Sequence, residues 1–117
     1  MKVYAFDIDE TLEVNRGPVT LNSIVALKEE GHCVGLCGNY AVVTNYVAGW
    51  HSLFSFIGPM EMTKAAFLGQ LKTYIPAEEV VMVGNIKGVS GTSDDKGAAD
   101  LAGVRFIKES DFAEGSR

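Results

Sequence analysis

The chain has 117 residues, of which 47% are hydrophobic and 21% charged. That length provides for one hydrophobic core and leaves no room for a second domain. A formal net charge of −5 argues against a broad surface for nucleic acid, because such a surface needs clustered Lys and Arg. No segment approaches the roughly 18 uninterrupted apolar residues of a membrane span, and the N-terminal apolar run ends at Asp7, too early for a secretory signal. We expect a cytoplasmic protein with no membrane partner.

Short apolar runs alternate with amphipathic stretches along the chain, which is typical of βαβ units and a parallel sheet. The predicted strands are 3–6, 33–37, 53–57, 80–83 and 104–107. The predicted helices are 20–30, 41–50, 64–74 and a short one that begins at Asp94 or Asp95 and ends at Ala102. The tail from Glu109 is polar and is expected to fray. The pattern predicts a three-layer α/β/α sandwich around a five-stranded parallel, Rossmann-like sheet.

Capping residues mark several of the predicted helix ends. Thr63 is the predicted N-cap of the helix that starts at Lys64, and Pro76 ends that helix. Gly31 and Gly103 stand where C-terminal caps belong. These signals set the connections between strands.

The two cysteines, Cys33 and Cys37, are expected to be free thiols. On an extended strand their spacing corresponds to about 13 Å, whereas a disulfide needs Cα atoms within roughly 7 Å. Free thiols agree with a reducing compartment. The spacing is not CxxC, and no second cysteine pair exists to complete a metal site.

Polar residues of a selective kind follow the predicted strands, where parallel α/β sheets bind their ligands. These residues are Asp7, Asp9, Glu10 and Thr11 after the first strand, Cys37, Gly38 and Asn39 at the second, Gly84 and Asn85 after the fourth, and Lys64 and Asp95 at two helix starts. We take this set, without Glu10 and Gly84, as the candidate site, because Glu10 is expected to face solvent rather than to act in catalysis.

The spacing of Asp7 and Asp9 indicates acid chemistry around a cation. Two carboxylates this close repel each other unless a cation lies between them or one is protonated, and Mg²⁺ is a hard cation that prefers oxygen ligands. An ionised Asp7 can act as a nucleophile toward a phosphoryl group. Asp9 can donate a proton to the leaving oxygen, and Lys64 can neutralise the charge that develops.

The run from Val3 to Leu12 resembles the first motif of the haloacid dehalogenase-like superfamily, whose phosphatases read DxDxT after an apolar strand. The segment from Asp95 to Val104 is similar to the last motif of that superfamily, with its DxxAAxxAGV continuation. Residues 81–84 resemble the strand that leads into this motif, and Lys64 stands where the third-motif lysine is expected. The motifs occur in order and span nearly the whole chain.

The resemblance implies a role for each matching residue. Asp7 would be the nucleophile and a metal ligand, and Asp9 the acid/base, with its backbone carbonyl on Mg²⁺. Asp95 would be the acidic residue of the metal site, although Asp94 competes for this role. Lys64 would hold the phosphoryl group. Apart from the resemblance, the Thr11 hydroxyl can donate locally and order the loop of the first motif, beside the substrate.

The sequence departs from the family pattern at two positions. Cys37 stands where the second motif has Ser or Thr, so phosphate contact would pass to the backbone N–H of Gly38 or to Asn39. Asn85 stands where the last motif has Asp, and Asp95 follows much later than the usual spacing of about four residues. The amide oxygen of Asn85 can still bind Mg²⁺.

The spacing between the motifs leaves no room for a cap domain. In the family, a missing cap implies an open site that accepts a macromolecular substrate or is closed by a neighbouring subunit. We therefore predict an Mg²⁺-dependent phosphatase acting on phosphomonoesters through an aspartyl-phosphate. Its physiological substrate and its oligomeric state stay open.

Other readings compete with this prediction. A catalytically inactive domain could bind a phosphorylated partner, as Cys37 and Asn85 allow. Asn85 also fits a metal-independent hydrolase of the dehalogenase branch, although Asp9 is a residue that phosphatases need and dehalogenases lack. Phosphoryl transfer to an acceptor other than water would use the same residues. Four aromatic residues are assigned to the core or to a self-association surface: Tyr46, Trp50, Phe54 and Phe56.

Overall fold

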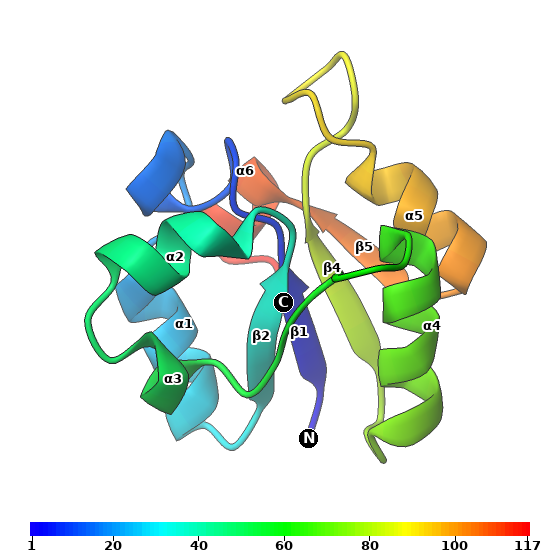
Figure 1. Cartoon of the computed structure of the whole chain (residues 1–117), viewed down its shortest axis with the longest axis horizontal. Helices are drawn as coiled ribbons and strands as arrows, with labels where there is room; N and C mark the ends of the chain where they lie inside the picture. The colour runs from blue at the N-terminus through cyan, green and yellow to red at the C-terminus, as the bar shows by residue number, and fades with distance from the viewer.

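A computed structural model describes residues 1–117, and its centre is a sheet of five parallel strands in the order β3-β2-β1-β4-β5 (Figure 1). The strands are β1 (Val3–Phe6), β2 (Cys33–Cys37), β3 (Ile57–Gly58), β4 (Val80–Gly84) and β5 (Arg105–Lys108). β1 pairs with both β2 and β4. The predicted three-layer α/β/α sandwich with a five-stranded, Rossmann-like sheet is confirmed.

Helices cover both faces of this sheet (Figure 1). They are α1 (Leu21–Glu29), α2 (Tyr40–Tyr46), α3 (Trp50–Leu53), α4 (Lys64–Tyr74), α5 (Asp95–Ala102) and α6 (Glu109–Ala113), with a 3₁₀ turn η1 (Glu13–Asn15). α4 and α5 lie together on one face, and α1, α2 and α3 lie on the other. None of the helices combines the length and apolar character that crossing a bilayer requires.

The central strand β1 is buried on both faces and divides the core into two clusters. Tyr4 and Phe6 face a cluster of 15 buried residues beneath α1, α2 and α6. Val3 and Ala5 face a cluster of 8 buried residues beneath α4 and α5. Side chains of a strand point alternately to opposite faces, so a strand buried on both sides is apolar throughout. This double burial anchors the strand that Asp7 directly follows.

The predicted helix caps are present and set where the polar loops begin. The Thr63 hydroxyl accepts a hydrogen bond from the backbone N–H of Ala66, which fixes Lys64 as the first residue of α4. Asp94 is the N-cap of α5 and accepts from Gly97 N–H, so Asp95 is the first residue inside that helix. Of the two predicted candidates, Asp94 is therefore the residue that caps the helix.

The predicted strand over 53–57 is wrong in its position. Leu53 ends the short helix α3, and the strand β3 itself consists of Ile57 and Gly58, although Ser55 and Phe56 also form backbone hydrogen bonds with β2. The predicted helix over 41–50 is likewise divided, because α2 ends at Tyr46 and Gly49 takes a left-handed φ of 73°. A short apolar run fits a buried helix turn as well as a strand, so periodicity alone does not separate the two.

The predicted fraying of the tail is also wrong. Residues Glu109–Ala113 form α6, and the side chain of Phe112 is fully buried. Its ring packs edge-on against Phe6, with ring centroids 5.3 Å apart, and against Tyr4 at 6.2 Å. The tail is mostly polar, so its composition did not indicate that Phe112 would be buried.

Candidate functional site

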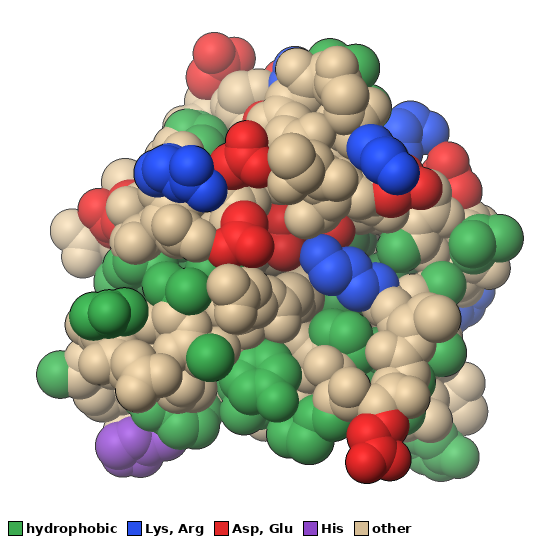
Figure 2. All heavy atoms as spheres, turned by 45° about the horizontal axis from the view of Figure 1, so that its top comes forward, with side chains coloured by type: hydrophobic (Ala, Val, Ile, Leu, Met, Phe, Trp, Pro, Cys, Tyr) green, Lys and Arg blue, Asp and Glu red, His purple; other side chains and the backbone are tan.

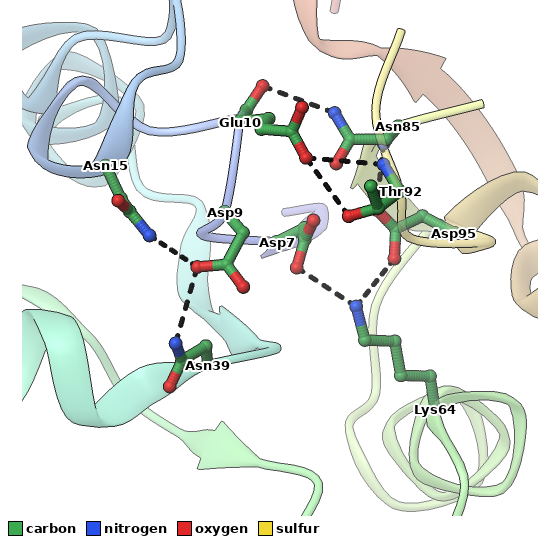
Figure 3. A network of polar contacts seen from close by, with 9 residues as sticks. All are labelled: Asp7, Asp9, Glu10, Asn15, Asn39, Lys64, Asn85, Thr92 and Asp95. Carbon is green, nitrogen blue, oxygen red and sulfur yellow. Dashed lines mark hydrogen bonds and ion pairs between the residues drawn. The ribbon is translucent and has the colours of Figure 1, made fainter. Parts of the chain in front are cut away.

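Residues from four distant segments meet at the carboxyl ends of the strands (Figure 3). Asp7 and Asp9 follow β1, and Asn39 follows β2. Lys64 begins α4, and Asp95 begins α5. Figure 2 shows this edge from outside, with acidic side chains gathered near its middle and a basic side chain beside them. The sequence-predicted residues therefore share one location.

One ammonium group joins two buried carboxylates at the centre of the site. Lys64 Nζ donates to Asp7 Oδ1 at 3.0 Å and to Asp95 Oδ1 at 2.7 Å. Asp7 is 1% exposed and Asp95 is fully buried, whereas the Lys64 side chain is one quarter exposed. A single positive charge thus faces two negative ones in a place with little water.

This imbalance shifts the ionisation of the cluster. Burial raises the pKa of Asp7 from its ordinary value of 3.8 to about 7; the charge of Asp95 adds to this effect, and the charge of Lys64 opposes it. Burial by itself would lower the pKa of Lys64, but the charges of Asp7 and Asp95 outweigh it, so that pKa is raised. The ammonium is therefore charged at neutral pH, while the pKa of Asp7 lies near neutral pH instead of well below it.

Asn85 is held with its amide oxygen facing away from any partner. Its backbone N–H donates to Asp95 Oδ2 at 2.8 Å, and its side-chain Nδ2 donates to the carbonyl of Glu10 at 3.2 Å. Since the amide nitrogen is engaged, the oxygen Oδ1 remains as a buried acceptor with no hydrogen bond. Asn85 is fully buried.

Glycines leave the space that these side chains occupy. A Cβ on Gly38 would lie 2.3 Å from Asp7 Oδ1, and one on Gly84 would lie 2.3 Å from Asp95 Oδ2. A Cβ on Gly91 would lie 2.5 Å from the amide carbon of Asn85. The sequence analysis singled out none of these close approaches, because they depend on how distant segments pack.

The loop after β4 is tied to the first motif by Glu10. Its carboxylate accepts from the backbone N–H of Thr92 at 3.3 Å and from the Thr92 hydroxyl at 3.1 Å (Figure 3). Glu10 itself takes a left-handed backbone with φ 57°. Neither residue carries a sequence signal for this contact, which the sequence analysis missed.

Asp9 lies beside the central cluster and is held by two amides. Its Oδ1 accepts from Asn15 Nδ2 at 2.5 Å and from Asn39 Nδ2 at 3.4 Å. Asn39 was among the predicted site residues, whereas Asn15 was not. Asn15 belongs to η1, a turn that the apolar pattern does not indicate.

The remaining predicted residues are placed as follows. Cys37 lies in the apolar cluster beneath α4 and α5, where burial raises the pKa of its thiol to about 12 and keeps it neutral. The backbone N–H of Gly38 donates to the carbonyl of Gly58 at 2.8 Å, so a phosphate contact at this N–H would have to replace that hydrogen bond. The Thr11 hydroxyl is buried without a hydrogen-bond partner.

Buried oxygens without partners test whether a cation fits. Asp7 Oδ2 and Asn85 Oδ1 both lack a hydrogen bond, although buried polar atoms nearly always have one. No group of three or more His, Cys, Asp or Glu side chains is arranged to hold a metal ion. Mg²⁺, however, uses one or two carboxylates with amide or carbonyl oxygens and water. The residues present fit such an ion.

The cluster lies outside the surface cavities. Three cavities of 380 to 490 Å³ are present, and none is lined by Asp7, Asp9, Lys64 or Asp95. The arrangement chemically offers a carboxylate nucleophile, a second acid and a cationic side chain. No protein-family model, curated protein or solved structure matches the chain, so the geometry and the sequence motifs carry the functional argument.

Proposed function

We propose that the protein is an Mg²⁺-dependent phosphohydrolase that cleaves phosphomonoesters through an aspartyl-phosphate on Asp7. One observation carries the proposal: the buried Asp7 carboxylate has one oxygen on Lys64 and the other without a partner. The DxDxT run and the other motifs in order support a haloacid dehalogenase-like phosphatase.

The ion would be held by Asp7, Asn85 and Asp95 together with the backbone carbonyl of Asp9. When bound, Mg²⁺ supplies positive charge that offsets the repulsion between a carboxylate and an anionic phosphate. Without such an ion, burial and the charge of Asp95 raise the pKa of Asp7 to about 7. The unpaired oxygens of Asp7 and Asn85 support their assignment as ligands.

In the first step, an oxygen of Asp7 forms a bond to phosphorus. The bond from phosphorus to the ester oxygen breaks, and its electron pair goes to that oxygen, which takes a proton from Asp9. The products are an alcohol and an acyl-phosphate on Asp7. Lys64, which already binds Asp7, stabilises the negative charge around phosphorus.

In the second step, water replaces Asp7 on phosphorus. The Asp9 carboxylate accepts a proton from the water as its oxygen bonds to phosphorus. The bond to Asp7 breaks, its electron pair returns to the carboxylate, and phosphate leaves. Asp9 is again protonated and ready for the next substrate. Asn39 is the remaining candidate for a phosphate contact at the end of β2.

The substrate is proposed only as a class. The site lies outside the three cavities, which favours a substrate presented from a larger molecule. The net charge of −5 disfavours nucleic acid. We place the protein in the cytoplasm because Cys33 and Cys37 are both free thiols. Self-association stays open.

The test is phosphate release from p-nitrophenyl phosphate. We expect turnover with Mg²⁺ that stops with excess EDTA, and a loss of at least about 10³-fold in Asp7→Asn and Asp9→Asn. Asp100→Asn is the matched control, because Asp100 is exposed and pairs only with Lys96 on its own helix. Acid-quenched wild-type protein should carry phosphate that hydroxylamine releases.

Other results would support the rivals. Phosphate binding by calorimetry without turnover of any phosphate ester would indicate a binding domain. Activity that persists in EDTA would indicate a metal-independent hydrolase. Transfer of phosphate to added glycerol in preference to water would indicate a phosphotransferase.

A further inference from the structure

Asp9 is held by two amide groups on the same oxygen (Figure 3). Asn15 Nδ2 is 2.5 Å and Asn39 Nδ2 is 3.4 Å from Asp9 Oδ1, and no hydrogen bond within the protein reaches Oδ2. We infer that Asn15 is a positioning residue that fixes the Asp9 carboxylate and leaves Oδ2 to exchange the proton with the substrate. This inference rests on the proposed function.

Backbone hydrogen bonds within a tight turn bring Asn15 next to Asp9. The carbonyl of Asn15 accepts from Glu10 N–H at 2.9 Å, so the residue is bonded to the segment of Asp9 through its main chain as well as its side chain. Asn15 N–H and Gly17 N–H both donate to the carbonyl of Leu12. A Cβ on Gly17 would lie 2.0 Å from the carbonyl carbon of Thr11, which shows how closely the turn folds back.

Backbone strain flanks the same contact. Glu10 with φ 57° and Arg16 with φ 68° are the two non-glycine residues with positive φ in the chain. Glu10 directly follows Asp9, and Arg16 directly follows Asn15. Residues other than glycine rarely take this backbone conformation. Where they do, contacts with the surrounding structure stabilise it, often at functional sites.

The two hydrogen bonds to Asp9 Oδ1 have a direct chemical consequence. Asp9 is only half-buried, so without partners its side chain can rotate about χ1. Proton transfer needs the donor and acceptor within about 2.6–3.2 Å. Two amide donors on Oδ1 hold one rotamer and leave Oδ2 free to exchange a proton with the substrate. Removing Asn15 removes the shorter of the two contacts and should slow the steps in which Asp9 transfers a proton, of which kcat/KM reports only the first, the delivery to the leaving group.

The kinetic test compares substrates that differ in their need for that proton. For Asn15→Ala, we expect kcat/KM to fall about tenfold on an alkyl phosphate, a part of the roughly 10²–10⁴-fold that general acid catalysis supplies. On 2,4-dinitrophenyl phosphate, whose leaving group departs without a proton, we expect a change of less than about twofold. Asn45→Ala is the matched control, since Asn45 donates only to Ala41 of its own helix.

A second variant separates hydrogen bonding from space filling. Asn15→Asp keeps the volume of the side chain but replaces the amide donor with a carboxylate that repels Asp9. We expect its loss on the alkyl phosphate to equal or exceed that of Asn15→Ala. Restoration of activity by Asn15→Asp, or equal losses on both substrates in Asn15→Ala, would overturn the inference.

A measurement without substrate keeps the inference apart from the proposed function. Three-bond couplings from backbone ¹⁵N and ¹³C′ to Asp9 ¹³Cγ report its χ1 rotamer. We expect one rotamer in the wild type and in Asn45→Ala, and averaged couplings in Asn15→Ala. Unchanged couplings in Asn15→Ala would overturn the inference. A wild-type protein that hydrolyses neither substrate would refute the phosphatase proposal, while the couplings would still decide whether Asn15 holds Asp9.

Discussion

At the scale of single residues, Asp7 is placed where a negative charge is unfavourable. It is 1% exposed, its neighbour Asp95 is also buried, and only Lys64 compensates for both. Burial is the main cause that raises the pKa of Asp7 to about 7. A carboxyl that binds its proton more tightly in the folded state than in the unfolded state makes stability depend on pH. The ionised form of Asp7 is thus present at the expense of the stability of the folded state.

We predict that Asp7→Asn stabilises the metal-free protein at pH 8 by about 2 to 4 kcal/mol, at about 1.4 kcal/mol per pKa unit. The folded wild type binds the Asp7 proton more tightly than the unfolded chain does, and this tighter binding stabilises the folded state. The stabilisation is fully present below pH 3.8 and is lost as the pH rises through about 7. The higher stability of Asp7→Asn relative to the wild type should therefore disappear as the pH is lowered to 4. Urea unfolding in EDTA, followed by Trp50 fluorescence, measures the difference.

Asp100→Asn serves as the control for this measurement. Asp100 is 63% exposed and pairs with Lys96 one helical turn away, so its replacement should change stability by less than about 0.5 kcal/mol at every pH. An advantage of Asp7→Asn that stays constant from pH 4 to pH 8 would contradict the assigned ionisation.

At the scale of elements, α6 depends on tertiary packing. A helix of five residues is far too short to be stable by itself. Phe112 is fully buried between its own helix and the rings of Tyr4 and Phe6. The guanidinium of Arg117 lies 3.9 Å from the centre of the Phe112 ring and closes the outer side. The C-terminal segment therefore completes the core beneath β1.

We predict that Phe112→Ala lowers the free energy of unfolding by about 3 to 5 kcal/mol, as expected when a buried aromatic side chain is removed. Tyr74→Ala is the matched control, because Tyr74 is 77% exposed at the end of α4 and should cost less than about 0.5 kcal/mol. Urea unfolding measures both. Equal, small losses in the two variants would mean that the tail frays after all.

At the scale of the whole molecule, the site joins segments that are far apart in the chain. Lys64 connects the end of β1 to the start of α5, and Glu10 connects the first loop to the loop after β4. An ion bound at Asp7 and Asn85 would add to these connections. A ligand that binds only the folded state stabilises the protein as a whole by mass action.

We predict that Mg²⁺ at about 100 times its Kd stabilises the protein by about 2.7 kcal/mol. For a chain of this size the thermal midpoint should rise by roughly 10 °C, and EDTA should reverse the rise. Differential scanning calorimetry measures it. Asn85→Ala, compared with its own metal-free midpoint, should lose most of the shift, whereas Asn45→Ala should retain it. A full shift in Asn85→Ala would remove that amide oxygen from the ligand set.

Local signals were sufficient for much of the architecture. Apolar runs identified four of the five strands closely, and Thr63, Gly31 and Gly103 marked helix ends, because each of these depends on a few neighbouring residues. The direction of parallel strands then brought Asp7, Lys64 and Asp95 together at one edge. β3 was placed too early in the chain and α6 was not predicted, since a two-residue strand and a five-residue helix depend on packing against the rest of the chain.

The sequence by itself thus determined the fold class and the acids and lysine of the candidate site. Only the tertiary structure decided which oxygens lack partners, which residues hold Asp9 and Asn85, and where glycines leave room for them. Asn15 and Thr92 have no local signal, because their roles arise from contacts with residues in other segments. Strand and cap formation are governed by nearest neighbours in sequence, whereas the protonation and orientation of a buried carboxylate are governed by its neighbours in space.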